Sequence, residues 1–292
     1  MPSAVDYRSV RIGHWVFWLL KGTLDSSSIE SLAAIVDRQP YSKHPQTLPF
    51  TWPLETAANQ FFLKVFHRRR GAAQIKDLLR QTKARRFWRQ GMALSASGFN
   101  VPLTVLFGES RRWGRPERSL VLTEKIEGQP APVYLSRLAY SGHNRAQVKI
   151  KRCALAELGQ MVRRFHDLGF VHGDLVATNI FVAEQIDASL AFYLMDNDRT
   201  QRYPAWLTAN LRKRNLVQLN RMPLAHITLQ DRMRFFRSYL KVERFGNAQR
   251  ELATWLERKT RQRRHDVDGA DTNANFRKLM TWHEPTAPRS RP

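Results

Sequence analysis

The chain has 292 residues, with 48 lysines and arginines against 25 aspartates and glutamates, and its formal net charge is +23. This length suits one large domain or two compact lobes, and a single cysteine, Cys153, excludes a disulfide framework and a cysteine zinc site. We expect Cys153 to be a small buried residue in a reducing compartment. The charge favours a polyanionic partner, either a surface rich in anionic lipid or glycolipid or, as the rival, a nucleic acid.

The amino-terminal segment shows no secretory signal. Residues 1–10 include Asp6 and lack a basic region followed by a long apolar core. The most apolar early run, Trp15–Leu20, is far too short to span a bilayer, and we expect Trp15 and Trp18 to pack in a core. The sequence therefore predicts a protein that stays in the cytoplasm.

A strand is predicted at Phe61–Phe66, and it carries a lysine. At a period of two residues, Lys64 shares a face with Phe62 and Phe66. An unpaired ammonium group on that apolar face would be unfavourable, so Lys64 needs an anionic partner. The alternative is a lysine on an edge strand whose ammonium group reaches water.

The middle of the chain predicts a strand, a connector and a long helix. Leu120–Ile126 is a strand that leads into a connector interrupted by prolines, with a domain boundary at about Gly128. Residues 145–168 have helical periodicity, and Gly169 stands where a helix end favours a left-handed residue. We expect His166 to pack beneath the loop that follows. The predicted apolar stripe of the helix is Val148, Cys153, Leu155, Leu158, Val162 and Phe165.

Three side chains that carry oxygen atoms follow this helix in close succession. Asp174 lies in the run His172-Gly173-Asp174-Leu175, and Asn179 comes directly before the apolar run Ile180-Phe181-Val182. Asp196 follows a second apolar run, Phe192–Met195. Both apolar runs predict short strands, which would hold the asparagine and the second aspartate on rigid supports.

This order of residues suits phosphoryl transfer from ATP. Because the protein has little covalent work to do in that reaction, catalysis comes from positioning the acceptor hydroxyl and neutralising charge with Mg²⁺. An aspartate in a catalytic loop can accept the proton of the acceptor, and a later asparagine and aspartate supply oxygen ligands to the metal. Asp174, Asn179 and Asp196 fit these three roles, so the sequence predicts a kinase.

After Arg199 the pattern is again helical. Residues 204–219 and 229–239 predict two helices on the acceptor side of the larger lobe. From Arg261 onward the chain is polar, and we expect a frayed tail.

The segment around Asp174 resembles the catalytic core of the protein-kinase-like superfamily. Gly173 stands where protein kinases carry arginine, and in this respect the segment is similar to the small-molecule and atypical branches of that superfamily. Asp196-Asn197-Asp198-Arg199 resembles the Asp-x-Asp-Arg signature of the lipopolysaccharide core kinases, where most other branches have Asp-Phe-Gly or a near variant. The resemblance therefore favours the lipopolysaccharide core (Kdo/heptose) kinase family.

The resemblance implies a two-lobed α+β fold, with a small β-rich amino-terminal lobe and a mostly helical carboxy-terminal lobe. It implies that Lys64 binds the nucleotide phosphates and that the backbone near Glu124 meets adenine at the hinge. His172 and Asp198 are expected to support the catalytic loop and the metal ligand. The amino-terminal lobe is expected at residues 1–127, with an amino-terminal extension, and it would bind the nucleotide. The carboxy-terminal lobe is expected at 128–260, with the catalytic loop. A basic tail is expected at 261–292.

Two features depart from the family pattern. A glutamate that pairs with the strand lysine is missing, since Asp77 is the only acidic residue between Val65 and Gly108 and Phe87 stands roughly where such kinases place the glutamate. No Gly-x-Gly-x-x-Gly motif precedes Lys64. The loop that would cover the phosphates is therefore not identified.

The favoured function is an ATP- and Mg²⁺-dependent kinase that phosphorylates Kdo or heptose in the lipopolysaccharide inner core. Its expected partners are an anionic glycolipid precursor and the inner leaflet of the inner membrane, where the protein would be peripheral. One alternative is a RIO- or Bud32-type atypical kinase that acts on protein or near RNA. The other is a pseudokinase that serves as a membrane-associated binding module. The sequence does not say which sugar or hydroxyl is phosphorylated.

Overall fold

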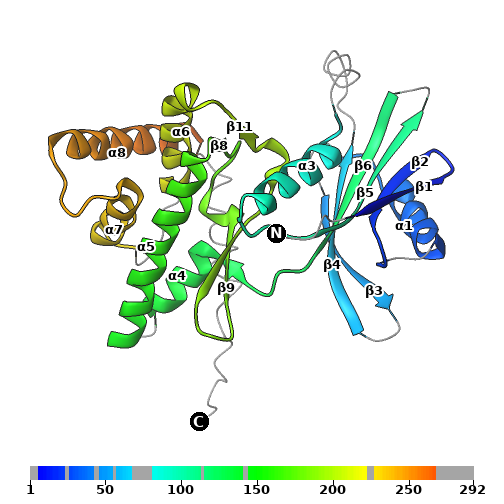
Figure 1. The fold of residues 1–292 in the computed structure, drawn as a ribbon, viewed down its shortest axis with the longest axis horizontal. Coiled ribbons are helices and arrows are strands. Elements are labelled where there is room, and N and C mark those ends of the chain that lie inside the picture. The colour runs from blue at the N-terminus through cyan, green and yellow to red at the C-terminus, as the bar shows by residue number, and fades with distance from the viewer. Residues whose placement is uncertain are drawn as a thin grey trace, which may run out of the picture. The chain divides into compact units, whose positions relative to one another are not determined.

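The computed structural model describes residues 6–23, 26–42, 46–54, 57–67, 81–112, 115–140, 144–221 and 227–267. The chain forms two compact units (Figure 1). The first, here called the sheet unit, comprises residues 1–127 and 193–199. The second, the helical unit, comprises residues 128–192 and 200–292.

The sheet unit is built on six antiparallel strands in the order β1-β2-β5-β6-β4-β3. Strand β4 is therefore an interior strand, paired with β6 on one side and β3 on the other. The strands are β1 Tyr7–Ile12, β2 Trp15–Leu20, β3 Gln46–Leu54, β4 Ala57–His67, β5 Thr104–Arg112 and β6 Arg115–Glu124.

Apolar side chains occupy both faces of this sheet. Helix α1 (Ser26–Arg38) packs with the alternate residues Leu63 and Val65 of β4 in one cluster. Helix α3 (Lys83–Ala96) packs against Phe66 in another. The predicted two-sided burial of the lysine strand is confirmed, because residues pointing to opposite faces of β4 belong to different clusters.

The run Trp15–Leu20 forms the core strand β2. Trp15 is buried, and Trp18 stacks on Phe107 with 4.7 Å between ring centroids. The prediction that both tryptophans pack in a core is confirmed. Within the described ranges, no helix has both the length and the apolar character that crossing a bilayer requires.

Five helices dominate the described part of the helical unit: α4 Ala131–Tyr140, α5 Arg145–Asp167, α6 Thr208–Asn220, α7 Leu229–Leu240 and α8 Asn247–Val267. Short strands and turns connect them, in two small sheets ordered β10-β9-β7 and β11-β8. These elements are β7 Gln129–Pro130, β8 Phe170–Val171, η1 Ala177–Asn179, β9 Ile180–Glu184, β10 Leu190–Leu194, η2 Asn197–Arg199, β11 Gln201–Arg202 and η3 Ala205–Leu207. Of these, η2 and the end of β10 belong to the sheet unit.

The long predicted helix is α5. The side chain of Asn144 caps its first turn by accepting a hydrogen bond from the Ala146 amide, and Gly169 follows its end with a left-handed φ of +83°. The prediction that Cys153 is buried is wrong, since this residue is exposed. Lys151 lies on the buried face instead, because Asp231 of α7 supplies a carboxylate 2.7 Å from its ammonium nitrogen.

The first residues of the predicted carboxy-terminal tail belong to a helix. Helix α8 runs through Arg261 to Val267, and Thr260 is fully buried with its hydroxyl bonded to the Leu256 carbonyl. The helix therefore continues through the polar residues that follow Arg261 as far as Val267. The rest of the predicted tail, 268–292, lies outside the described residues.

Replacing Gly169 with alanine should destabilise the helical unit. A Cβ atom at this position would lie 2.5 Å from the Tyr203 carbonyl oxygen, and the residue would have to keep a positive φ. We expect a loss of about 1–3 kcal/mol, measured by urea denaturation. Gly91→Ala in α3 is the control, because a Cβ there meets nothing within 4 Å. Equal effects of the two substitutions would contradict this account.

Candidate active site

Lys64 lies in the middle of the interior strand β4. Its side chain is 18% exposed and forms an ion pair with Asp196. Its ammonium nitrogen also lies 5.5 Å from the centroid of the Phe66 ring. The alternative of a lysine on an edge strand is wrong, because β4 has a neighbour on both sides. A buried ammonium group requires an anion, and in this structure the anion is the carboxylate of Asp196.

The segment after β10 holds Asp196 in a special backbone conformation. Asp196 has a φ of +54°, a left-handed value that aspartate adopts more readily than most residues. Two hydrogen bonds fix the chain just before it: the Leu194 amide donates to the Asn100 carbonyl at 2.9 Å, and the Asn197 side chain donates to the Leu194 carbonyl at 2.7 Å. The carboxylate is therefore presented by a braced turn.

Asp198 is the most deeply buried carboxylate of the signature, with 8% of the residue exposed. Burial raises its pKa, and the neighbouring carboxylate of Asp196 raises it further. Lys64, Arg199 and Lys83 act in the opposite direction. Asp196 and Asp198 thus form a concentration of negative charge beside Lys64, all within the sheet unit.

The position at which the family pattern expects a glutamate is occupied by Phe87 of α3. This side chain is buried against Phe66 and Phe107, and it carries no charge that could pair with an ammonium group. Asp77 lies outside the described residues. A carboxylate that the sequence reasoning missed is Glu109 of β5, which is 3% exposed and accepts a hydrogen bond of 2.7 Å from the Thr82 hydroxyl. No local pattern in the sequence distinguished it.

Glu124 is the last residue of β6, at the predicted hinge. Its amide donates to the Leu103 carbonyl at 3.0 Å, and the next amide, that of Lys125, donates to the Gln60 carbonyl. Partial burial raises the pKa of the Glu124 carboxyl. The end of the strand is thus anchored on two sides, while its contact with adenine stays a prediction.

In the helical unit, the loop after β8 carries His172, Asp174 and Asn179. His172 is 1% exposed, and its Nδ1 atom accepts a hydrogen bond of 3.0 Å from the Asp174 amide. The side-chain amide of Asn179 donates to the Asp174 carbonyl at 2.9 Å. Asp174 is therefore held through its backbone from both sides, and its carboxylate extends from a fixed turn.

Two amide side chains of α6 form hydrogen bonds with the backbone of this loop. Asn215 accepts a hydrogen bond of 3.0 Å from the His172 amide and donates one of 2.6 Å to the His172 carbonyl. Gln218 donates to the Gly173 carbonyl at 3.2 Å and accepts from the Leu175 amide at 3.3 Å.

The two amide groups also bond each other, at 2.9 Å, and the Gln218 nitrogen lies 3.5 Å from an Asp174 carboxylate oxygen. We call Asn215 and Gln218 the amide pair. The sequence reasoning missed it because both residues lie about forty positions beyond the loop.

His166 lies directly beneath the amide pair. It is fully buried, as the sequence predicted, with Nε2 3.3 Å from the Asn215 side-chain oxygen and Nδ1 2.9 Å from the Tyr239 hydroxyl. Because that oxygen only accepts hydrogen bonds, Nε2 carries the proton and Nδ1 accepts from the hydroxyl. Burial lowers the pKa of His166 to about 4, so the ring is neutral at neutral pH.

The structure thus brings the predicted residues together in two sets. Lys64, Asp196 and Asp198 meet in the sheet unit. His172, Asp174 and Asn179 meet in the helical unit. Within the described ranges, no cluster of three His, Cys, Asp or Glu side chains is suited to hold a metal ion.

Comparison with solved structures identifies the class of fold. "WaaP in complex with acyl carrier protein" is 21% identical, covers 78% of this chain and 91% of that chain, and has a TM-score of 0.53. The Toxoplasma gondii rhoptry antigen kinase domain is 14% identical, covers 60% and 59%, and has a TM-score of only 0.33, a similarity too low to bear on the fold. The predicted protein-kinase-like fold, with one β-rich and one helical part, is confirmed.

The family is shown by the sequence comparison. The model of the lipopolysaccharide kinase (Kdo/WaaP) family matches residues 42–239, about two thirds of the chain, while no curated protein matches significantly. The chain belongs to this family. It is accordingly a kinase, a phosphotransferase that uses ATP and an alcohol acceptor, as the sequence predicted.

The neutral His166 predicts that the protein loses stability in mild acid. The pKa is about 4 in the fold against an ordinary 6.5. Between these two pH values the imidazole is protonated in the unfolded chain but neutral in the folded protein. The stabilisation is complete above pH 6.5 and is lost as the pH falls toward 4. At about 1.36 kcal/mol per pKa unit, we expect a loss of up to about 3 kcal/mol, measured by urea denaturation at a series of pH values.

His166→Gln is the control for this titration. It removes the group that titrates, so the difference between its stability and that of the wild type should change over this pH range. Parallel pH profiles for the two proteins would contradict the assignment of a neutral buried ring.

Proposed function

We propose that this kinase phosphorylates a sugar hydroxyl, on Kdo or heptose, in the inner core of lipopolysaccharide. The observation that carries the proposal is the pairing of family membership with an anchored Asp174. The strong basic charge supports an anionic acceptor. Which of the two sugars is the substrate depends on the shape of the acceptor site.

Asp174 is proposed as the general base. Its carboxylate extends from a turn whose backbone is bonded to His172 and Asn179, so the group has a defined position. In the reaction, the acceptor oxygen forms a bond to the γ-phosphorus as the bond to the β,γ-bridging oxygen breaks. Asp174 accepts the proton of the acceptor hydroxyl, and ADP leaves with the bridging oxygen.

Asn179 and Asp196 are proposed to hold Mg²⁺. Their chemistry fits the ion, because an amide oxygen and a carboxylate are hard ligands and Mg²⁺ usually takes only one or two protein ligands besides water and phosphate. Asn179 uses its nitrogen to bond the Asp174 carbonyl, which leaves its oxygen as the ligand atom. When bound, the ion would neutralise charge on the transferred phosphoryl group.

Lys64 and Glu124 are proposed to bind the nucleotide. Lys64 is presented on a rigid interior strand, and a phosphate would offer its ammonium group an anion in addition to Asp196. Glu124 lies at a strand end that is anchored by the amides of Glu124 and Lys125, which would give the contact with adenine a fixed position. His172 and Asp198 are proposed as supports of the catalytic loop and of Asp196, as their burial and contacts favour.

The protein is proposed to act in the cytoplasm, at the inner face of the inner membrane. Its net charge of +23 would attract it to anionic lipid. Of the two alternative functions, family membership disfavours the RIO- or Bud32-type reading, and the presence of Asp174, Asn179 and Asp196 disfavours a pseudokinase.

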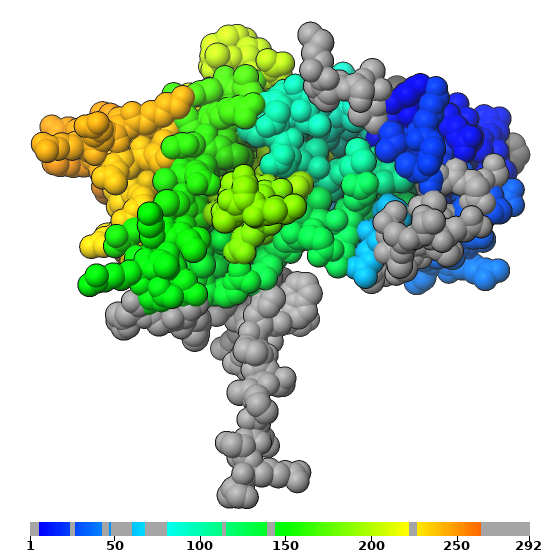
Figure 2. Space-filling model, turned by 60° about the horizontal axis from the view of Figure 1, so that its bottom comes forward, coloured from blue at the N-terminus to red at the C-terminus, as the bar shows by residue number. Residues whose placement is uncertain are grey.

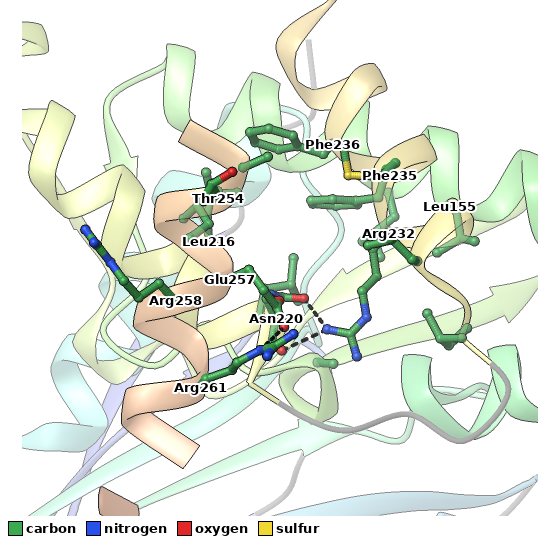
Figure 3. A pocket seen from close by; sticks show the side chains of 18 of the residues that line it. Leu155, Leu216, Asn220, Arg232, Phe235, Phe236, Thr254, Glu257, Arg258 and Arg261 are labelled. Atoms are coloured by element: carbon green, nitrogen blue, oxygen red, sulfur yellow. Dashed lines mark hydrogen bonds and ion pairs between the residues drawn. The ribbon is translucent and has the colours of Figure 1, made fainter. Parts of the chain in front are cut away.

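We also propose an acyl carrier protein as a partner, as in the solved WaaP complex. The observation that favours it is a cavity of about 800 Å³ in the helical unit (Figure 3). Aliphatic and aromatic side chains form its walls, chiefly Leu135, Leu155, Leu158, Leu216, Phe235 and Phe236. Four arginines also line it: Arg232, Arg250, Arg258 and Arg261.

The character of this cavity suits an acyl chain with a polar end. Protein interiors are close-packed, and a volume within the range of roughly 300–1,000 Å³ is typical of a ligand site. Arg232 bonds Asn220, and Arg261 pairs with Glu257, so two of the arginines are held in place around the cavity. Apolar walls would take the chain, and the arginines would attract the acidic surface of a carrier protein.

Phosphate transfer should depend on Asp174. With labelled γ-phosphate of ATP, we expect label in Kdo-lipid A or in heptosylated lipid A, and Asp174→Asn should lower the rate by about 10²–10⁴-fold, as expected for loss of a general base. Asp187→Asn, at an exposed aspartate whose carboxylate accepts hydrogen bonds from Ser189, is the matched control and should keep full activity. Absence of transfer to either glycolipid by the wild type would contradict the proposed function.

Binding of the carrier protein should depend on its acyl chain. Ala253 of α8 lines the cavity, so Ala253→Trp should fill it and weaken binding of palmitoyl-acyl carrier protein roughly tenfold or more, which is about 1.4 kcal/mol. Calorimetry would measure this. The matched control is Ala248→Trp on the same helix, which does not line the cavity. Equal affinity for the acylated and unacylated carrier would contradict the proposal.

A further inference from the structure

A short run of apolar residues lies on the surface of the helical unit. Its members directly precede α6 and are all exposed: Pro204, Ala205, Trp206 and Leu207. Trp206 is 80% exposed and Leu207 is 43% exposed. A run of exposed apolar residues is unfavourable in water and indicates a binding role. We call residues 204–207 the apolar tip, and Figure 2 shows the yellow-green segment around it as a protrusion from the helical unit.

Hydrogen bonds hold the apolar tip in one conformation. Within it, the Leu207 amide donates to the Pro204 carbonyl at 3.0 Å. Directly after it, the Thr208 hydroxyl donates to the Ala205 carbonyl at 2.7 Å. Trp206 is therefore exposed on an ordered turn, and an ordered turn loses less conformational freedom when it binds a partner.

The charge around the apolar tip is positive. Residues 200–230 contain no aspartate or glutamate, and their basic side chains are Arg202, Arg212, Lys213, Arg214 and Arg221. Arg202 and Arg214 are exposed. The Nε atom of Arg202 donates to the Leu168 carbonyl at 3.0 Å, which fixes this guanidinium group at the base of the tip.

An acidic residue at the base of the tip is paired with several cations. Asp167 directly precedes Leu168 at the end of α5. Its carboxylate lies 2.8 Å from Arg163, 3.4 Å from Lys241 and 3.8 Å from Arg212. Because three cations surround one anion, this cluster keeps a net positive charge. The surface around the tip therefore favours an anionic partner.

We propose that the apolar tip and the arginines beside it dock the helical unit on an anionic phospholipid bilayer. Trp206 and Leu207 enter the interface between head groups and acyl chains, where tryptophan is favoured. Arg202 and Arg214 meet the phosphates of the head groups. A protruding apolar tip with cations beside it matches a bilayer, which presents anionic groups above an apolar interior. The inference rests on the proposed function, because it names the surface with which the kinase meets a membrane-bound acceptor.

Rigid elements connect this surface to the catalytic loop. Strand β11, which ends at Arg202, pairs with β8, and His172 of the loop directly follows β8. Helix α6 begins directly after the tip, and Asn215 of the amide pair lies about 10 Å along it. The docked tip would thus keep Asp174 at a short and fixed distance from the bilayer, as a sugar close to its lipid anchor requires.

Two positions elsewhere in the helical unit provide matched controls. Ile186, in the turn between β9 and β10, is fully exposed, but Glu184 and Asp187 flank it, and anionic lipid repels these carboxylates. Arg145, the first residue of α5, is an exposed arginine. It lies about 35 Å along the helix axis from Leu168 at the base of the tip.

Flotation with vesicles tests the docking surface without ATP or glycolipid, so the result is independent of the proposed kinase reaction. The probes are vesicles of phosphatidylcholine with and without phosphatidylglycerol, and the wild type should bind only the anionic ones. Trp206→Ser should weaken this binding roughly tenfold through lost apolar burial, and Arg214→Gln roughly fivefold through lost charge. Ile186→Ser and Arg145→Gln should bind as the wild type does.

Quenching of tryptophan emission by brominated lipid tests insertion itself. Trp206→Phe keeps an apolar ring, so it should bind the anionic vesicles but lose most of the quenching. Absence of vesicle binding by the wild type, equal binding to neutral and anionic vesicles, equal losses in Trp206→Ser and Ile186→Ser, or unchanged quenching in Trp206→Phe would overturn the proposal. Vesicle binding that requires Trp206 would support the docking surface even if phosphate transfer failed.

Discussion

The position of the catalytic loop depends on the hydrogen bonds that other side chains make to its backbone. Buried amide and carbonyl groups must be paired, yet residues 172–175 belong to no sheet that could pair them. The amide pair of Asn215 and Gln218 supplies these partners from α6. Asn215 in turn accepts a hydrogen bond from Nε2 of His166, a buried and neutral ring that is oriented by the Tyr239 hydroxyl at Nδ1. The position of Asp174 is thus fixed by a chain of side chains that ends in α7.

A different constraint applies in the sheet unit, where a charged side chain is buried. Lys64 on an interior strand needs an anion, and the turn after β10 provides one in Asp196. Phe87 occupies the place where a glutamate was expected, and the aromatic cluster around it gives α3 an apolar contact with the sheet. The anion for Lys64 therefore comes from the signature that follows β10. This explains how the lysine can be buried although α3 offers no carboxylate among its described contacts.

The sequence predicted those parts of the molecule that are local. The strand of Lys64, the helix before the loop and the left-handed Gly169 follow from period, charge and a turn signal within a few residues. The order of Asp174, Asn179 and Asp196 predicted a kinase, and the resemblance that these residues carry predicted the fold. The prediction failed where tertiary partners decide: Cys153 was placed on the buried face because Asp231, which draws Lys151 inward, is distant in sequence. The amide pair, Glu109 and the cavity were missed for the same reason, since each combines residues from separate elements. The roles of the site residues stay predictions.

Steady-state kinetics of Gln218→Glu tests the central claim, that α6 positions the catalytic base, most directly. The substitution keeps the shape of the side chain and its acceptor for the Leu175 amide, but it replaces the donor near Asp174 with a carboxylate. We predict that kcat falls on the order of a hundredfold and that KM for ATP stays the same. An unchanged kcat would show that the loop is positioned without the amide pair and would contradict the account.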